Sequence, residues 1–120
     1  MATKVPPNPA HAALVERLRA LLADVPAQRE VSMFGGRSFM VNEKMIVSAL
    51  KHGALLVRVA ADRHEALLQH DGPAQAEMGA GRTMGPGWIE VAPEAIAADD
   101  RLRFWVDAAL EYNRAGNRPA

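Results

Sequence analysis

The segment best suited to hold an anion is Gly35-Gly36-Arg37, where two glycines stand beside a guanidinium. Exposed backbone amides next to an arginine could bind a carboxylate or a phosphate group. The same two glycines would also permit a tight bend between two paired strands, because glycine adopts conformations that other residues avoid. Both interpretations stay open, and we favour the bend.

Two further arginines, Arg58 and Arg82, lie in equally distinctive surroundings. If folding brings them together with Arg37, the three would form a cationic pocket for an anionic ligand or an acidic partner. Arg58 lies between Val57 and Val59, so strand alternation predicts that it faces away from them. Separate surface arginines are the alternative that we favour. Trp88 is a candidate interface anchor, with core or rim packing as its alternative.

The sequence predicts no catalytic residue, metal ligand or cofactor. Cysteine is absent, which excludes disulfides, thiolate metal sites and a cysteine nucleophile. The four histidines show no metal-ligand spacing, so we expect each of them at the surface. The glycine-rich stretch 78–87 fits neither a Walker A loop nor a Rossmann fingerprint, and a plain connector is the favoured interpretation. We therefore do not expect an enzyme.

The composition predicts one ordinary globular domain, with 49% hydrophobic and 23% charged residues in a chain of 120. We expect the domain at 9–113, between flexible tails at 1–8 and 114–120. The N-terminus lacks the apolar core of a signal peptide, and no apolar run is long enough to span a bilayer. A cytoplasmic protein without a membrane partner is the simplest expectation.

The net charge is zero, but the two halves of the chain differ in sign. Residues 1–60 carry eight Lys/Arg against four Asp/Glu, and residues 61–120 carry six against ten. A nucleic-acid binder usually shows a basic excess, so direct nucleic-acid contact is not expected. A surface with two signs would suit a protein partner or a homodimer, whereas interleaved charges are the alternative.

The hydrophobic pattern of the first half predicts a helix and then a meander of strands. Apolar residues at helical spacing indicate a helix over 9–24, which ends before Pro26. Short apolar runs predict strand segments on either side of Gly35-Gly36, then strands at 45–50 and 55–59. Asn42-Glu43-Lys44 is a plausible hairpin connection. Consecutive strands with short loops imply antiparallel pairing.

The second half returns to helices. Asp62 with Glu65 three residues later is typical of a capped helix start. A short strand follows at 88–91, and Pro93-Glu94 is suited to start a helical turn. Asp99 or Asp100 caps the last helix, whose apolar stripe runs to Leu110. Because alternating βαβ units are absent, we predict an α+β fold with one antiparallel sheet packed by helices.

The chain resembles the N-terminal domain of the TfoX family. The resemblance is carried by Met33-Phe34-Gly35-Gly36, Phe39-Met40-Val41-Asn42, Met45, Leu55-Leu56-Val57-Arg58-Val59, Glu65-Ala66-Leu67-Leu68, Gly81-Arg82-Thr83-Met84, Gly87-Trp88-Ile89-Glu90-Val91, Pro93-Glu94, Leu102, Trp105-Val106 and Ala109-Leu110. The resemblance implies the order α-β(3)-α-β(2)-α around one antiparallel sheet, similar to type III secretion chaperones. Longer members promote natural competence and carry a second, C-terminal domain, which we do not expect in a chain that stops at Ala120.

The sequence departs from the family pattern at two turns. Gly85-Pro86-Gly87 stands where a Lys-Gly pair is common, and Asn42-Glu43 replaces the more usual Asn-Gly. From the resemblance and the missing catalytic set, we expect a non-catalytic regulatory module that binds a protein partner, with a homodimer as one form. The alternative is a small-molecule or anion-binding domain that uses Gly35, Gly36, Arg37, Arg58, Arg82 and Trp88.

Overall fold

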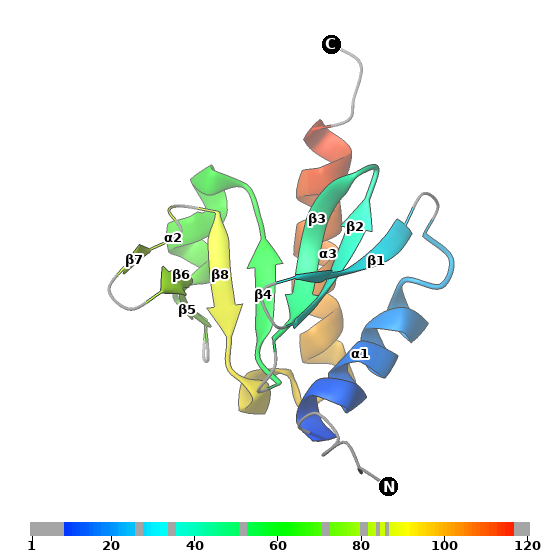
Figure 1. The fold of residues 1–120 in the computed structure, drawn as a ribbon. Helices are drawn as coiled ribbons and strands as arrows, with labels where there is room; N and C mark the ends of the chain where they lie inside the picture. The colour runs from blue at the N-terminus through cyan, green and yellow to red at the C-terminus, as the bar shows by residue number, and fades with distance from the viewer. Residues whose placement is uncertain are drawn as a thin grey trace, which may run out of the picture.

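A six-stranded antiparallel sheet forms the centre of the fold in the computed structural model (Figure 1). The structure describes residues 9–25, 28–33, 36–50, 53–70, 73–79, 82–83, 85 and 87–116. The strand order in the sheet is β1-β2-β3-β4-β8-β5, and β6 and β7 form a separate two-stranded hairpin. The strands are β1 Gln28–Met33, β2 Gly36–Val41, β3 Lys44–Ala49, β4 Leu55–Arg58, β5 Pro73–Gln75, β6 Glu77–Gly79, β7 Arg82–Thr83 and β8 Trp88–Val91.

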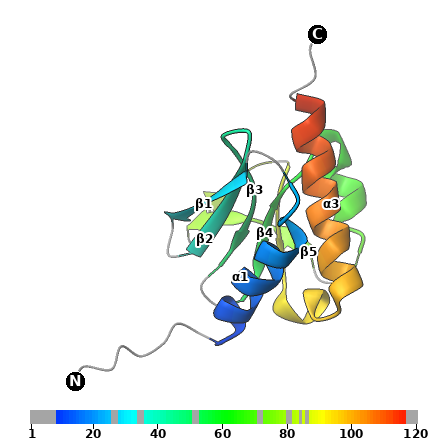
Figure 2. The same ribbon diagram turned by 90° about the vertical axis from the view of Figure 1, so that its right-hand side faces the viewer.

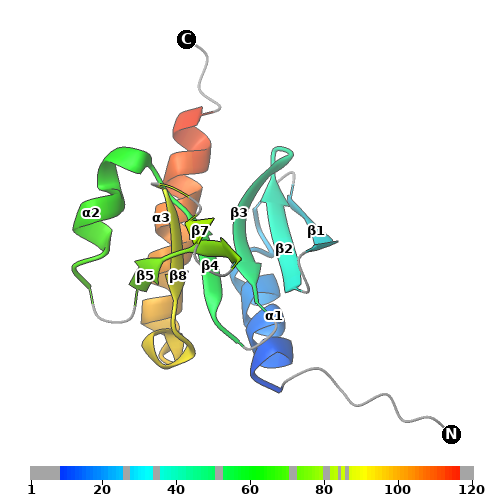
Figure 3. The ribbon, with the colours of Figure 1, turned by 60° about the vertical axis from the view of Figure 1, so that its left-hand side comes forward.

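The helices lie mainly on one side of this sheet. Their bounds are α1 Pro9–Leu21, α2 His64–Leu67 and α3 Asp99–Gly116, with 3-10 turns η1 Ala61–Arg63 and η2 Pro93–Ile96. Figure 2 shows α1 and α3 on the same face of the sheet, where α3 packs on β3 and β4. Figure 3 shows the β6–β7 hairpin on the opposite side of β4 and β8 from α3. The predicted α+β class with an antiparallel sheet is confirmed.

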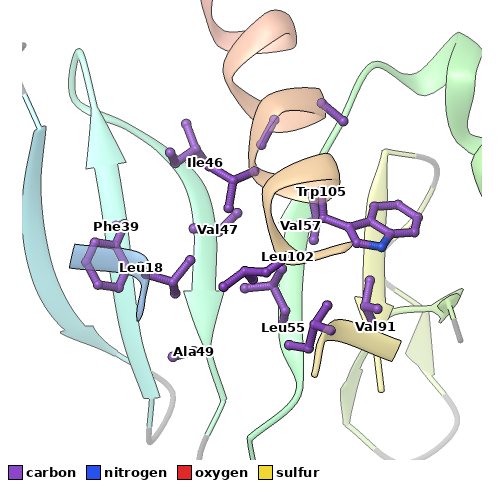
Figure 4. Close-up of a cluster of buried hydrophobic side chains, with 14 of the residues drawn as sticks. Leu18, Phe39, Ile46, Val47, Ala49, Leu55, Val57, Val91, Leu102 and Trp105 are labelled. Carbon is purple, nitrogen blue, oxygen red and sulfur yellow. The ribbon is translucent and has the colours of Figure 1, made fainter. Parts of the chain in front are cut away.

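The core lies between the sheet and the two long helices (Figure 4). Strand alternation sends every second residue to this side, and register aligns Phe39, Val47, Val57 and Ile89 in one row across β2, β3, β4 and β8. All four are fully buried. The stripe predicted for the last helix is also buried, at Leu102, Trp105, Val106, Ala109 and Leu110. Helical spacing therefore predicted the packed face of α3 correctly.

The opposite face of the sheet carries a polar pair in its middle. Ser38 and Ser48 face each other across β2 and β3, and both are buried. The Ser38 hydroxyl donates to the Ser48 oxygen at 3.1 Å, and the Ser48 hydroxyl donates to the carbonyl of Arg37 at 3.3 Å. This pairing satisfies hydroxyls that would otherwise be costly to bury.

The β2–β3 turn is a two-residue connection at Asn42 and Glu43. Both residues have positive φ, 53° and 66°. These angles match the type I′ turn that suits the twist of an antiparallel hairpin. Asn adopts this left-handed region more readily than Glu does, so the backbone at Glu43 is strained.

Several boundaries differ from the sequence predictions. The first helix ends at Leu21 rather than residue 24, where turn bonds such as Val25 N–H to the Leu22 carbonyl take over. Asp62 does not cap a helix, because η1 starts at Ala61 and neither η1 nor α2 has a side-chain cap hydrogen bond. The last helix continues through Arg114 to Gly116. Within the described ranges, no helix is long and apolar enough to cross a membrane.

Candidate binding site

The candidate site lies where strands β3 and β4 separate. Their ladder consists of Ala49–Leu55, Ser48–Leu56 and Val47–Val57. The remaining part of β3, from Lys44 to Ile46, runs beside β2, and Arg58 at the end of β4 pairs with Trp88 of β8. The end of α3 is visible between the two separating strands in Figure 1.

A surface pocket of about 410 Å³ occupies this opening. It is lined by Lys44 and Met45 from β3, Arg58 from β4, Trp88 from β8, and Tyr112 and Asn113 from α3. Three strands and the last helix therefore meet at one place, and the residues come from positions 44 to 113 of the chain. The volume lies within the range of pockets that bind small ligands or anchor side chains.

Arg58 is the best-positioned charge in the pocket. Its Cζ lies 5.0 Å from the centre of the Trp88 ring and 4.7 Å from that of Tyr112. Nη2 donates to the Tyr112 hydroxyl at 2.9 Å, and Nη1 donates to the Val59 carbonyl at 3.1 Å. Two aromatic contacts and two hydrogen bonds thus hold the partly buried guanidinium in one orientation.

Gly87 packs directly against the guanidinium of Arg58. Its φ is +95°, and a Cβ there would overlap Nη1 of Arg58 and approach the Val59 carbonyl oxygen to 2.8 Å. Its carbonyl accepts the Val59 N–H at 2.8 Å, and its own N–H donates to Nδ1 of His64 at 2.8 Å. Only glycine fits this conformation and this spacing without displacing Arg58.

His64 corrects one sequence prediction. It was expected at the surface, but it is only 5% exposed. Nδ1 accepts a hydrogen bond from the Gly87 N–H, which assigns the ring proton to Nε2. The expectation was wrong because α2 is only four residues long, and His64 and Leu67 form its buried face.

Asn113 lines the pocket and joins α3 to the β2–β3 hairpin. Its side-chain N–H donates to the Val41 carbonyl at 3.0 Å, and its oxygen accepts from the Asn42 side chain at 3.3 Å. The residue is 4% exposed. These bonds fix the last turns of α3 against the strands that border the pocket.

Among the described residues, the lining of the pocket carries positive charge and includes no carboxylate. Lys44 and Arg58 have no ion-pair partner among the described residues, although five other arginines do. These are Arg17 with Asp99, Arg19 with Glu16 and Glu30, Arg29 with Glu43, Arg37 with Glu30, and Arg63 with Glu111. The lining therefore has an unbalanced positive charge that an anion would complement.

A second pocket of about 430 Å³ has the opposite property. It lies between α1 and α3 and includes Arg17, Arg103, Asp99 and Asp100. Arg17 already binds Asp99 at 3.1 Å and the Ile96 carbonyl at 2.7 Å. Because charges of both signs are present and partly paired, this pocket offers no comparable preference for an anion.

The TfoX N-terminal domain matches residues 20–112, which is well over half of the chain. The chain belongs to the TfoX N-terminal domain family. The matched segment covers the pocket from Lys44 to Tyr112 and ends one residue before Asn113. A search of curated proteins gave no match.

In this TfoX N-terminal domain, the residues predicted as one site are divided. Arg58 and Trp88 come together as cross-strand neighbours. Arg37 pairs with Ala49 of β3, which in turn pairs with Leu55 of β4. Arg58 lies three positions after Leu55 on β4, so alternation places Arg37 and Arg58 on opposite faces of the sheet. Arg37 forms an ion pair with Glu30 instead, with 3.8 Å between Nε of Arg37 and Oε1 of Glu30. The side chain of Arg82, on β7, lies outside the described residues.

The glycine pair gives a partial answer. Gly35 lies outside the described residues. Gly36 is the first residue of β2, and a Cβ there would overlap the carbonyl oxygen of Ala49 on β3. This close approach supports the structural interpretation of Gly36, because the space beside its Cα is filled by the neighbouring strand.

Sequence reasoning missed Tyr112 and Asn113, which complete the pocket. The signal was present, because the α3 stripe continues from Trp105 and Ala109 to positions 112 and 113 at helical spacing. Polar residues at the end of an apolar stripe indicate a buried polar contact. Among the residues that the structure describes, no group of three or more His, Asp or Glu side chains could hold a metal ion.

Proposed function

We propose that this TfoX N-terminal domain is a non-catalytic regulatory module, and that it binds an acidic segment of a protein partner at the Arg58 pocket. The observation that carries the proposal is that Arg58 and Lys44 line the same pocket, in which no carboxylate is found among the described lining residues. A fixed arginine between aromatic rings is a frequent anchor at interfaces. The partner supplies the missing negative charge.

The composition of the pocket supports binding rather than catalysis. Its lining offers two cations, two aromatic rings, a thioether and an amide. The described lining residues include no Asp, Glu, His, Ser, Thr or Cys, the side chains that most often serve as base or nucleophile in acyl transfer. Binding through charge and aromatic contact requires none of these groups.

Display of random peptides on phage, selected against the immobilised domain, tests the proposal. We expect wild-type protein to enrich peptides that contain Asp or Glu, and Arg58→Gln to lose this enrichment. Arg63→Gln is the matched control, since it removes the same charge from an exposed arginine that pairs with Glu111, away from the described lining of the pocket. Equal enrichment by Arg58→Gln and wild type would contradict the proposal.

A free small anion is the second candidate, because the 410 Å³ pocket could enclose one. In that case the peptide selection gives no enrichment for any variant. A thermal-shift screen with small carboxylates and phosphates would then raise the melting temperature of wild type and of Arg63→Gln, but not of Arg58→Gln.

A further inference from the structure

We infer that the Arg58 pocket selects a carboxylate attached to an aromatic group, in preference to a phosphate. The inference rests on the proposed function, because it names the chemistry that the same pocket recognises. It follows from three properties of the site. The guanidinium of Arg58 is fixed, the pocket lies beside the C-terminal end of α3, and the walls of the pocket are apolar.

The first property is the orientation of Arg58. The bonds to Tyr112 and Val59 fix both terminal nitrogens, while the Trp88 and Tyr112 rings lie against the group. Other N–H groups of the guanidinium have no hydrogen-bond partner among the described residues. An arginine fork held in one plane matches the two oxygens of a planar carboxylate.

The second property is the position of the pocket along α3. Tyr112 and Asn113 lie in the last turns of a helix that ends at Gly116. The C-terminal end of a helix carries partial negative charge, which opposes a doubly charged phosphate more strongly than a singly charged carboxylate. Phosphate sites commonly use free backbone N–H groups, but the N–H of Gly87 is already bound to His64.

The third property is the wall around the cations. Trp88 and Tyr112 present rings, and Met45 presents a flexible thioether that adapts to the shape of its neighbour. Lys44 is exposed and borders the pocket as a second positive charge. A ligand that fills this space places its carboxylate on Arg58 and its ring along these walls.

NMR titration of the ¹⁵N-labelled protein tests the inference with four probes that separate charge, shape and ring. The probes are 3-phenylpropanoate, acetate, phenyl phosphate and the uncharged 3-phenylpropanol. The signals to follow are the indole N–H of Trp88 and the Nε–H of Arg58. We expect 3-phenylpropanoate to shift both signals with a Kd lower than that of each other probe by about tenfold or more, roughly 1.4 kcal/mol.

Three variants connect the binding to Arg58. Arg58→Gln should lose the response, and Arg58→Lys should weaken it because the charge stays but the fork is lost. Arg63→Gln should respond like wild type. A dispersed spectrum checks that each variant is folded, and Arg58→Lys provides a test if Arg58→Gln does not fold.

The result that overturns the inference is binding of phenyl phosphate as tight as that of 3-phenylpropanoate, or no shift of the two signals with any probe. Unchanged binding by Arg58→Gln overturns it as well. If phosphate wins while Arg58→Gln still loses acidic peptides in the display experiment, only the ligand class is wrong. If 3-phenylpropanoate binds best, a blocked peptide with adjacent Glu and Phe separates the sources of the carboxylate: tighter binding than 3-phenylpropanoate indicates a partner's side chain, and weaker binding a free acid.

Discussion

The guanidinium of Arg58 occupies the space that a side chain at position 87 would need. Gly87 therefore supports the pocket through Arg58, although it has no functional group and is not among the lining residues. This relationship also makes the orientation of Arg58 depend on a backbone segment that His64 holds from the other side. Substitutions along this contact should therefore affect both stability and binding.

Replacing Gly87 with alanine should destabilise the fold and displace Arg58. The left-handed φ of +95° costs an alanine about 1–2 kcal/mol, and the overlap with Arg58 and Val59 adds roughly 1–3 kcal/mol. Gly85→Ala is the matched control, because Gly85 has a similar φ of +91° but no atom of the described residues within 4 Å of the position that a Cβ would take. Urea unfolding measures both. Equal losses in the two variants would show that Arg58 simply moves aside.

Replacing His64 with alanine should release the Gly87 amide. The variant leaves a buried N–H without its acceptor, which costs about 1–3 kcal/mol in addition to the lost packing. His64→Asn keeps an acceptor oxygen near the position of Nδ1. Hydrogen exchange of the Gly87 amide reports on the contact directly. We expect strong loss of protection in the alanine variant and partial recovery with Asn; similar exchange in wild type and His64→Ala would argue against the anchor.

Stability should depend on pH through Glu30. Hydrogen bonds from Arg19, at 2.8 and 2.9 Å, hold the pKa of the Glu30 carboxyl below its ordinary value of 4.5, and the charges of Arg19 and Arg37 act in the same direction. A carboxyl whose pKa is lowered in the folded state stabilises the protein at pH values above its ordinary pKa. This contribution is lost as the pH falls through the lowered pKa.

Glu30→Gln should therefore be less stable than wild type near neutral pH, and the difference should shrink in acid. Thermal unfolding between pH 7 and pH 3 checks this. Glu16→Gln is the control, since Glu16 is a more exposed partner of the same Arg19. A Glu30→Gln deficit that stays constant down to pH 3 would mean that charge is not its origin.

Replacing Glu43 with glycine should stabilise the β2–β3 hairpin. The change relieves a positive φ of 66° at a residue with a side chain, which is worth about 0.5–1 kcal/mol after the higher flexibility of unfolded glycine is included. Glu43→Ala loses the same exposed ion pair with Arg29 but keeps the strain. The free energy of unfolding should rank glycine above alanine. The reverse order would show that the turn tolerates Glu without strain.

The sequence predicted the main elements because most of them carry a clear hydrophobic period. The first and last helices, the strands from Gln28 to Arg58 and the strand at Trp88 all follow such a pattern. Strands β5 to β7 were not predicted. Ala74, Gln75 and Glu77 give no alternation of apolar and polar residues, and these short strands are defined by their backbone pairing.

The site was only partly accessible to the same reasoning. Alternation predicted that Arg58 faces away from Val57, and Trp88 was a candidate, but their contact depends on the β4–β8 register. Register is set by pairing between distant segments, so neither segment contains it alone. Tyr112 reaches the pocket only because α3 crosses the sheet at the point where β3 and β4 part.

Adjacent residues of α3 bind to different sides of that opening. Tyr112 holds Arg58 on the β4 side, and Asn113 holds Val41 and Asn42 on the β2–β3 side. The end of α3 therefore connects β4 to the β2–β3 hairpin where β3 and β4 are no longer paired with each other. A ligand in the pocket would contact β3, β4 and the end of α3 together. If a ligand and a partner both favour one separation of β3 and β4, each raises the affinity for the other by the same factor.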